Sequence, residues 1–282
     1  MKVTVLGSGT PEPYGRRASS GYLVEVAGQK LLFDCGGGVV SRLLEIGVAP
    51  DAIDILVLSH LHSDHMIDYA RLIHAAWDMS GKSIEVYGPA PIAEINERLF
   101  GASGALAFDL AARTGYEPSQ EVWRERGGTV PCPWPEPQIT EIGPNFTLQG
   151  NGWSLKACEV PHAQPWLLCL AFRLEADGKV LTYSGDAGLC EGMEKLSADA
   201  DLLIHWCYRR EGQTISPQLD ARSPTPSLIA KMAARVGVKR LLLTHIRVQM
   251  DEPAARGAAL SALADHFPGE AGIAEDLDQI TL

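Results

Sequence analysis

Four potential metal ligands lie within six consecutive residues of this chain of 282 residues. The segment His60-Leu61-His62-Ser63-Asp64-His65 is separated by Ser59 alone from Ile55–Leu58, an apolar run typical of a strand that is buried on both faces. Imidazole and carboxylate groups are the ligands that suit zinc and related divalent metals. One tetrahedral ion does not need so many ligands from one short loop. The spacing therefore predicts two adjacent ions and a fold that brings further ligands to this loop.

Further ligands stand where three later hydrophobic strands are predicted to end. These strand ends are Pro161-His162, Ser184-Gly185-Asp186 and Thr244-His245. Loops at strand ends are where folds commonly place chemistry, and a carboxylate can bridge two ions about 3.5–4 Å apart. We expect His60, His62 and His162 at one ion, Asp64, His65 and His245 at the other, and Asp186 between them.

The predicted strands fall into two batches, each with helices after its strands. The first batch covers 3–6, 21–26, 30–33, 55–58 and 84–87, and the second covers 146–148, 154–160, 169–174, 180–184, 202–205 and 240–244. Such an order favours two sheets packed face to face with helices on both outer faces. We therefore expect an α/β fold and a single domain over residues 1–282.

Residues 101–137 are the least regular part of the sequence. Ala105–Arg113 has helical spacing, but the prolines at 131, 133, 135 and 137 forbid regular structure after it. We expect an irregular segment here that acts as a lid over the site or as an interface.

Composition narrows the class of partner. Asp and Glu number 35 against 24 Lys and Arg, a net charge of −11, which disfavours polyphosphate partners, and no Lys/Arg stripe is visible. The six cysteines form no Cys-x-x-Cys pair. The N-terminal apolar run is too short for a signal peptide, and no apolar stretch reaches the ~18 residues of a membrane span. These features predict a cytoplasmic protein with reduced thiols and a small-molecule substrate, with nucleic acid unlikely and no membrane association.

The order of these motifs resembles the metallo-β-lactamase superfamily, in its ribonuclease Z and arylsulfatase-like branch. The resemblance rests on H-x-H-x-D-H and the later His, Asp and His, with the opening Val-Leu-Gly-Ser-Gly-Thr-Pro, Phe33-Asp34-Cys35-Gly36 and the closing Ile273–Leu277. It implies a four-layer αββα sandwich of two mixed sheets, a homodimer, and an Asp34 that supports the metal loop. The cofactors expected are two divalent ions, zinc first, with manganese or iron as alternatives.

Two such ions lower the pKa of a bridging water to about 7, so hydroxide forms at neutral pH. Asp64 is the candidate catalytic residue, because its carboxylate could orient that nucleophile or relay its proton. The sequence identifies no substrate-binding residue. Trp153, Trp166, Trp206 and Tyr208 could line an apolar pocket or fill the core, and both readings stay open. His74 and His266, on predicted helices, are expected in surface or packing roles.

The chain departs from ribonuclease Z-like enzymes at two positions that are understood to protonate an alkoxide leaving group. Trp206 follows His205 where those enzymes place an acidic residue, and Asp220–Pro226 lacks their downstream histidine. Alkoxides leave poorly without a proton donor, whereas phenolates need less help. The first hypothesis is therefore a hydrolase of a small ester-like molecule: an aryl sulfate, phosphodiester, lactone or carboxyl ester. The alternative is a tRNA 3′-processing endonuclease in which His205 donates the proton, and the third is a non-catalytic metal-dependent binding protein.

Overall fold

Two seven-stranded mixed sheets form the centre of the molecule. The structure is a computed structural model that describes residues 1–12, 14–220 and 222–282. The first sheet contains, in spatial order, β14 (Gln279–Thr281), β1 (Lys2–Gly7), β2 (Gly21–Val26), β3 (Gln29–Phe33), β4 (Ile55–Val57), β5 (Glu85–Gly88) and β6 (Gln138–Glu141). The second contains β13 (Glu270–Ile273), β12 (Arg240–Thr244), β11 (Leu202–Trp206), β10 (Lys179–Tyr183), β9 (Leu170–Ala176), β8 (Trp153–Glu159) and β7 (Thr147–Gln149).

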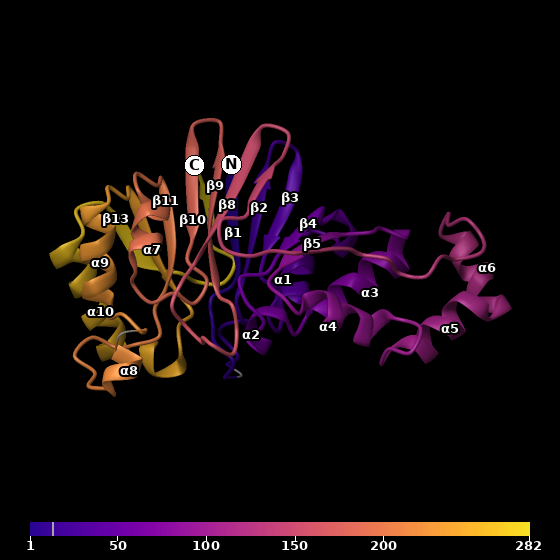
Figure 1. Cartoon of the computed structure of the whole chain (residues 1–282), viewed down its shortest axis with the longest axis horizontal. Helices are drawn as coiled ribbons and strands as arrows, with labels where there is room; N and C mark the ends of the chain where they lie inside the picture. The colour runs from indigo at the N-terminus through magenta and orange to yellow at the C-terminus, as the bar shows by residue number, and fades with distance from the viewer. Residues whose placement is uncertain (13, 221) are drawn as a thin grey trace.

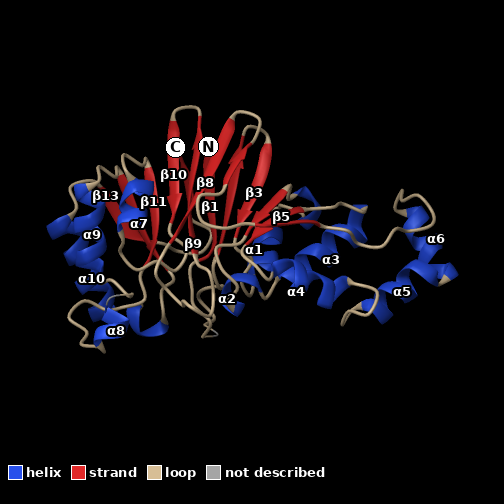
Figure 2. Cartoon of the chain, viewed as in Figure 1, coloured by secondary structure: helices blue, strands red, loops and turns tan. Residues whose placement is uncertain are grey.

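Helices cover the outer faces of both sheets (Figures 1 and 2). Those in the first half of the chain are α1 (Val39–Glu45), the 3₁₀ turn η1 (Pro50–Ala52), α2 (Ser63–Met66), α3 (Tyr69–Ser80), α4 (Ile92–Phe100), α5 (Ala107–Gly115) and α6 (Glu117–Glu125). Those in the second half are α7 (Glu191–Ser197), α8 (Pro217–Asp220), α9 (Pro226–Arg235), the 3₁₀ turn η2 (Val248–Met250) and α10 (Pro253–His266). The predicted four-layer αββα sandwich is confirmed. No helix in the described ranges has the length and apolar character that a bilayer crossing requires.

Side chains on successive strand positions enter different cores, which explains why the strands are apolar on both faces. Ile55 and Val57 of β4 belong to the core between the sheets, together with Phe33 and Phe172. Leu56 lies on the opposite face of β4, in the core beneath the helices. Successive side chains of a strand point to opposite faces, so a sheet covered on both sides needs an unbroken apolar run such as Ile55–Leu58.

The strand directions bring the predicted ligand positions to one edge. The strands β10, β11 and β12 are mutually parallel. The strand β8 runs in the same direction as β10, because β8 and β10 are both antiparallel to β9. The loops that follow β8, β10 and β12 therefore leave the second sheet on the same side. The backbone N–H of Leu170, where β9 begins on this edge, donates to the carbonyl of Ser59 in the loop after β4, at 2.9 Å. This bond joins the site edges of the two sheets.

The segment 101–137 contains more regular structure than its sequence predicts. The expected helix forms as α5, but a second helix, α6, follows it after a single residue. Residues 101–106 and 126–137, which include the proline-rich stretch, contain neither helix nor strand. Figure 1 shows α5 and α6 at one end of the molecule, well away from α2 and α8. A role for this segment as an interface, and the homodimer, stay predictions.

A buried ion pair ties the first loop of the chain to its C-terminal part. The Arg17 guanidinium donates to both carboxylate oxygens of Asp251, at 2.6 and 2.8 Å, and the side chains are 0% and 2% exposed. Arg17 also donates to Ser8 Oγ and to the carbonyl of Ala274, both at 2.5 Å. These bonds meet most of the hydrogen-bonding capacity of the guanidinium, which is the condition under which a buried charge is tolerated.

Replacing Asp251 should therefore destabilise the fold strongly. Asp251→Ala removes the partner that binds Arg17 through two hydrogen bonds and leaves the buried charge with Glu275 alone, at 3.1 Å. The loss should therefore approach about 3–5 kcal/mol, the cost of breaking a buried pair. Glu191→Ala is the control, because Glu191 pairs with Lys195 on an exposed surface of α7, where such pairs contribute little to stability. Urea unfolding of the variants measures both. Equal losses in the two variants would show that the Arg17 pair has no special structural weight.

Candidate metal centre

The loop after β4 carries the first two histidines and leads into α2, which carries the next two ligands. His62 is the last residue before α2, and its carbonyl accepts the backbone N–H of His65 at 3.0 Å. This turn lets Asp64 and His65 face a different part of the site from His60 and His62. One short segment therefore contributes to two neighbouring groups of ligand atoms.

The first group consists of imidazole nitrogens that converge. His60 Nε2 lies 3.0 Å from His62 Nδ1, and His162 Nε2, from the loop after β8, lies 3.3 Å from the same His62 atom. His60 is fully buried, and His162 is partly exposed. Three ring nitrogens at these separations could hold one cation.

The second group lies beside the first. Asp64 Oδ2 is 2.9 Å from Nε2 of His245, the residue that follows β12, and 3.6 Å from His65 Nε2. All three side chains are buried. Their ligand atoms could hold a second cation.

Asp186 contacts both groups, as predicted from its place after β10. Its Oδ1 atom is 3.3 Å from His65 Nε2. Its Oδ2 atom is 3.3 Å from His245 Nε2 and 3.6 Å from His162 Nε2. The carboxylate is therefore placed where it could bridge two cations.

Asp34 fixes the orientation of this ligand set from behind. Its carboxylate is 2.7 Å from His65 Nδ1 and accepts hydrogen bonds from the backbone N–H and hydroxyl of Ser59, at 2.7 and 2.8 Å. The Tyr183 hydroxyl, from the other sheet, donates to it at 2.5 Å. Burial, reinforced by Asp34, raises the pKa of Tyr183 well above its usual range, so the phenol keeps its proton and donates. With Nδ1 bound to Asp34, His65 presents Nε2 to the site.

The protonation states of these side chains fit a metal ion. Burial, with the nearby His65 adding to it, holds the pKa of His60 well below its usual value, and burial lowers the pKa of His162 to about 4. Both rings are then neutral near pH 7 and can offer a lone pair, as metal ligands must. No proton acceptor among the described residues pairs with the buried His65 Nε2 within hydrogen-bonding geometry.

The carboxylates complete a donor set that attracts positive charge. Burial would raise the pKa of Asp186, but the adjacent His245 and His65 hold that pKa well below its usual value. Burial also opposes ionisation of Asp64, yet the hydrogen bond with His245 lowers its pKa. Burial would lower the pKa of His65, whereas Asp186 and Asp34 raise it well above normal. Two ionised carboxylates beside the neutral imidazoles of His60 and His162 suit divalent cations such as zinc, and a cation bound at His65 Nε2 would displace the proton there.

Two glycines allow the strand ends to approach one another. A Cβ on Gly36 would lie 2.1 Å from the carbonyl oxygen of Asp64, so only glycine lets this loop pass beside α2. Gly185 has a φ of +54°, and a Cβ there would lie 2.7 Å from the Leu170 carbonyl. Both conditions select glycine, and they place the Asp34 and Asp186 segments against the metal loop.

A cavity of about 450 Å³ opens onto the ligands. His62, Asp64, His162, Asp186 and His245 line it, and the remaining lining residues are Pro11, Trp206, Tyr208, Ser216, Gln218, Leu219 and Arg222. None of the described lining residues comes from 101–137, so the structure gives no support to a lid there. The wall beside the ligands is formed instead by Trp206, Tyr208, Ser216, Gln218, Leu219 and Arg222. Of the four aromatic residues left open by the sequence, Trp206 and Tyr208 line the cavity, Trp153 lies in the core, and Trp166 is exposed.

His205 is not placed to act on a substrate in this cavity. On β11, Leu202 and Ile204 enter the core between the sheets, whereas Leu203 enters the core under the outer helices. Strand alternation puts His205 on the face of Leu203 and Trp206 on the face of Ile204. His205 is fully buried, its Nδ1 is 2.8 Å from the carbonyl of Trp206, and it does not line the cavity. This placement gives no support to the part of the alternative hypothesis in which His205 donates a proton.

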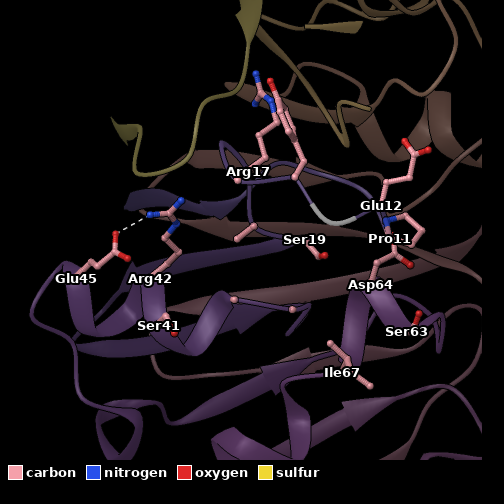
Figure 3. Close-up of a pocket in the computed structure, with 15 residues that line it drawn as sticks. Pro11, Glu12, Arg17, Ser19, Ser41, Arg42, Glu45, Ser63, Asp64 and Ile67 are labelled. Carbon is pink, nitrogen blue, oxygen red and sulfur yellow. Dashed lines mark hydrogen bonds and ion pairs between the residues drawn. The ribbon is translucent and has the colours of Figure 1, made fainter. Parts of the chain in front are cut away.

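A second cavity of about 730 Å³ adjoins the first and shares Pro11 and Asp64 with it. Figure 3 shows Ser63 and Asp64 on one side of this cavity and Arg42 with Glu45 on the other. Arg42 is paired with Glu45 and Asp276, so its charge is already balanced. Asp64 can therefore be approached from two sides.

Comparison with known proteins agrees with this site. The Beta-lactamase superfamily domain profile matches residues 29–246. This chain belongs to the metallo-β-lactamase superfamily. It is 30% identical to a protein named ribonuclease Z from Mycolicibacterium gilvum, over 99% of this chain and 96% of the relative. It is 27% identical to another of that name from Mycobacterium bovis, over 99% and 98%. The predicted superfamily and the hydrolase class are confirmed.

Solved structures share the fold over their whole length. The metallo-beta-lactamase fold protein YhfI from Bacillus subtilis aligns with a TM-score of 0.76 at 23% identity, covering 99% of this chain and 98% of that one. The short form of human tRNase Z aligns with a TM-score of 0.71 at 21% identity, covering 100% and 99%. These likenesses support the four-layer fold of this metallo-hydrolase.

The structure brings together all seven residues that the sequence predicts as ligands. It also reveals residues that no sequence pattern singles out. Tyr183 holds Asp34, Leu219 lines the cavity, and Arg222 reaches it from the segment that lacks the expected histidine. Tyr183 reads as an ordinary core residue, and only the polar environment at the strand ends distinguishes it.

Weakening the support behind His65 should weaken metal binding without unfolding the protein. Asp34→Asn removes the charge that fixes the His65 ring, and such losses cost about 10–100-fold in metal affinity. Asp109→Asn is a matched control, because Asp109 contacts His74 Nε2 at 3.1 Å on the surface. Zinc affinity by chelator competition, with circular dichroism as the check on folding, measures the effect. Unchanged affinity in folded Asp34→Asn would contradict the role of Asp34.

Proposed function

We propose that this chain is a binuclear metal-dependent phosphodiester hydrolase. The observation that carries the proposal is the convergence of two complete ligand groups, with Asp186 in contact with both, at the wall of an open cavity. Zinc is the first candidate for both ions, because the donor set is imidazole and carboxylate. A non-catalytic binding protein would have no need of an accessible pair of ions of this kind.

The proposed division of work among the residues follows from their placement. His60, His62 and His162 would hold one ion, Asp64, His65 and His245 the other, and Asp186 would touch both. Two bound cations would supply Lewis acidity and a water that deprotonates near neutral pH. Asp64 is ionised and lines both cavities, so its carboxylate is placed to orient the attacking water and accept its proton. Asp34 and Tyr183 keep His65 in the orientation this requires.

RNA is the first substrate class to test. The relatives that match nearly end to end are named ribonuclease Z, which favours the tRNA 3′-processing reading and revises the expectation that nucleic acid is an unlikely partner. The net charge of −11 is an average over the whole chain. It does not exclude a short single-stranded RNA end at a site with local positive charge.

An activated small ester is the second candidate, and the cavity itself favours it. Trp206 lines the cavity where the resembling enzymes have their acidic residue, and Arg222 lines it from the segment in which they have a histidine. An arginine does not give up its proton. His205 faces away. Without a proton donor, the departing oxygen must carry its charge unless a metal ion stabilises it, so phenolate-like groups should leave far more easily than alkoxides.

One set of assays separates the two candidates. We expect the zinc-loaded protein to cleave phosphodiesters, and Asp64→Asn, purified identically, should be inactive and serve as the control for contaminating nucleases. Rates are measured for a precursor tRNA with a 3′ trailer and for a series of methyl aryl phosphodiesters whose leaving-group pKa ranges from about 7 to 10. Efficient trailer removal at physiological salt identifies the nuclease, whereas a flat dependence on leaving-group pKa with an intact precursor shows that a metal ion stabilises the departing oxygen. A steep dependence with an intact precursor identifies the aryl ester hydrolase. No cleavage of any diester would overturn the proposed function.

A further inference from the structure

One wall of the cavity is apolar and already rigid. The rings of Trp206 and Tyr208 are stacked, with 6.0 Å between their centroids and 16° between their planes. The Arg247 guanidinium lies over the Tyr208 ring, 4.6 Å from its centroid. Arg247 is in turn held by a hydrogen bond to Gln249 Oε1 at 2.6 Å. Side chains fixed in this way lose little freedom when a ligand packs against them. Leu219 of α8 extends the wall, and it is 44% exposed.

The cavity also carries a positive charge that lacks an acidic partner. Arg222 donates from Nη1 to the carbonyls of His162 and Gln164, at 3.2 and 3.4 Å. Within the described ranges no carboxylate lies within 4.0 Å of its guanidinium, whereas Arg209 is paired with Asp220. The two carbonyls fix Arg222 above the loop that carries His162 but leave its charge unbalanced.

The indole of Trp206 provides a further sign of a missing partner. Trp206 is 4% exposed, and its Nε1 atom is buried without an acceptor in the part of the chain that the structure describes. A buried donor without an acceptor is costly. This N–H therefore stands unsatisfied at a residue that lines the cavity.

We propose that this cavity binds a flat ring joined to a tetrahedral anion, with the ring against Trp206, Tyr208 and Leu219 and the anion on Arg222. The inference rests on the proposed function and names its substrate class: an aryl or nucleoside ester of an anionic acid. A guanidinium recognises a phosphoryl group through paired N–H donors, and a cavity of about 450 Å³ accommodates a group of that size. Arg222 thus binds the anion in the segment where the resembling enzymes place a histidine.

Isothermal titration of the zinc-loaded protein with non-hydrolysable probes tests the subsite. Phenylphosphonate should bind about tenfold more tightly than methylphosphonate, because only its ring covers the apolar wall. Leu219→Ala and Tyr208→Leu should reduce this ratio severalfold; both side chains are partly exposed, so the variants should fold. Equal affinities of the two probes for the wild-type protein would overturn the ring site.

The anion contact is tested separately. Arg222→Gln should weaken both phosphonates about tenfold while their ratio stays the same, since a charged hydrogen bond is lost without any change to the wall. Arg235→Gln is the matched control, because Arg235 lies on α9 and pairs with Glu194 away from the cavity. If Arg222→Gln binds both phosphonates as tightly as the control, Arg222 does not bind the anion.

Uridine monophosphate as a third probe distinguishes the two sources of this chemistry. Tighter binding than phenylphosphonate identifies a nucleotide, and weaker binding an aryl ester; either outcome supports the subsite if the Arg222 and Leu219 variants respond as expected. These titrations do not depend on turnover. Binding without diester cleavage would overturn the proposed function alone, and diester cleavage with unresponsive variants would overturn the subsite alone.

Discussion

The carboxylate of Asp34 connects the fold to the chemistry. It accepts hydrogen bonds from the Tyr183 hydroxyl, on one sheet, and from the Ser59 backbone, in a loop of the other sheet. It also contacts the ring of His65. Asp34 itself has a φ of +58°, a conformation that a non-glycine residue adopts at some cost and that commonly marks a functional position. A buried carboxylate is tolerated only when its oxygens are hydrogen-bonded. Moving any one of these partners would therefore disturb the sheet packing and the orientation of His65 together.

The site places like groups against each other in a way that favours a bound cation. Imidazole nitrogens face one another at 3.0 and 3.3 Å, and the Asp64 and Asp186 carboxylates both lie near His245. Such an arrangement would be costly in a core that served packing alone. The edge where parallel strands end can position such a set of side chains, because loop backbones there turn sharply. Gly185 and His245, whose φ is +62°, lie at such turns.

The metal ligands could be predicted because each follows a strand that is recognisable in the sequence. A buried strand reads as an apolar run, and its end places a side chain at the sheet edge, so His162, Asp186 and His245 could be selected from residue type and position. The helix α6 could not be predicted, because prolines further along the segment obscure the short helical pattern of Glu117–Glu125. Tyr183 and Arg222 could not be selected either. Their roles depend on which strand or loop lies opposite, and that is a property of the tertiary fold.

The proposed function requires that each of the two ligand groups binds an ion. Anomalous diffraction at the zinc edge, from crystals of the zinc-loaded protein, tests this most directly. We expect two peaks about 3.5–4 Å apart, one among His60, His62 and His162 and the other among Asp64, His65 and His245, with Asp186 in contact with both. A single peak, or peaks at other residues, would contradict the account.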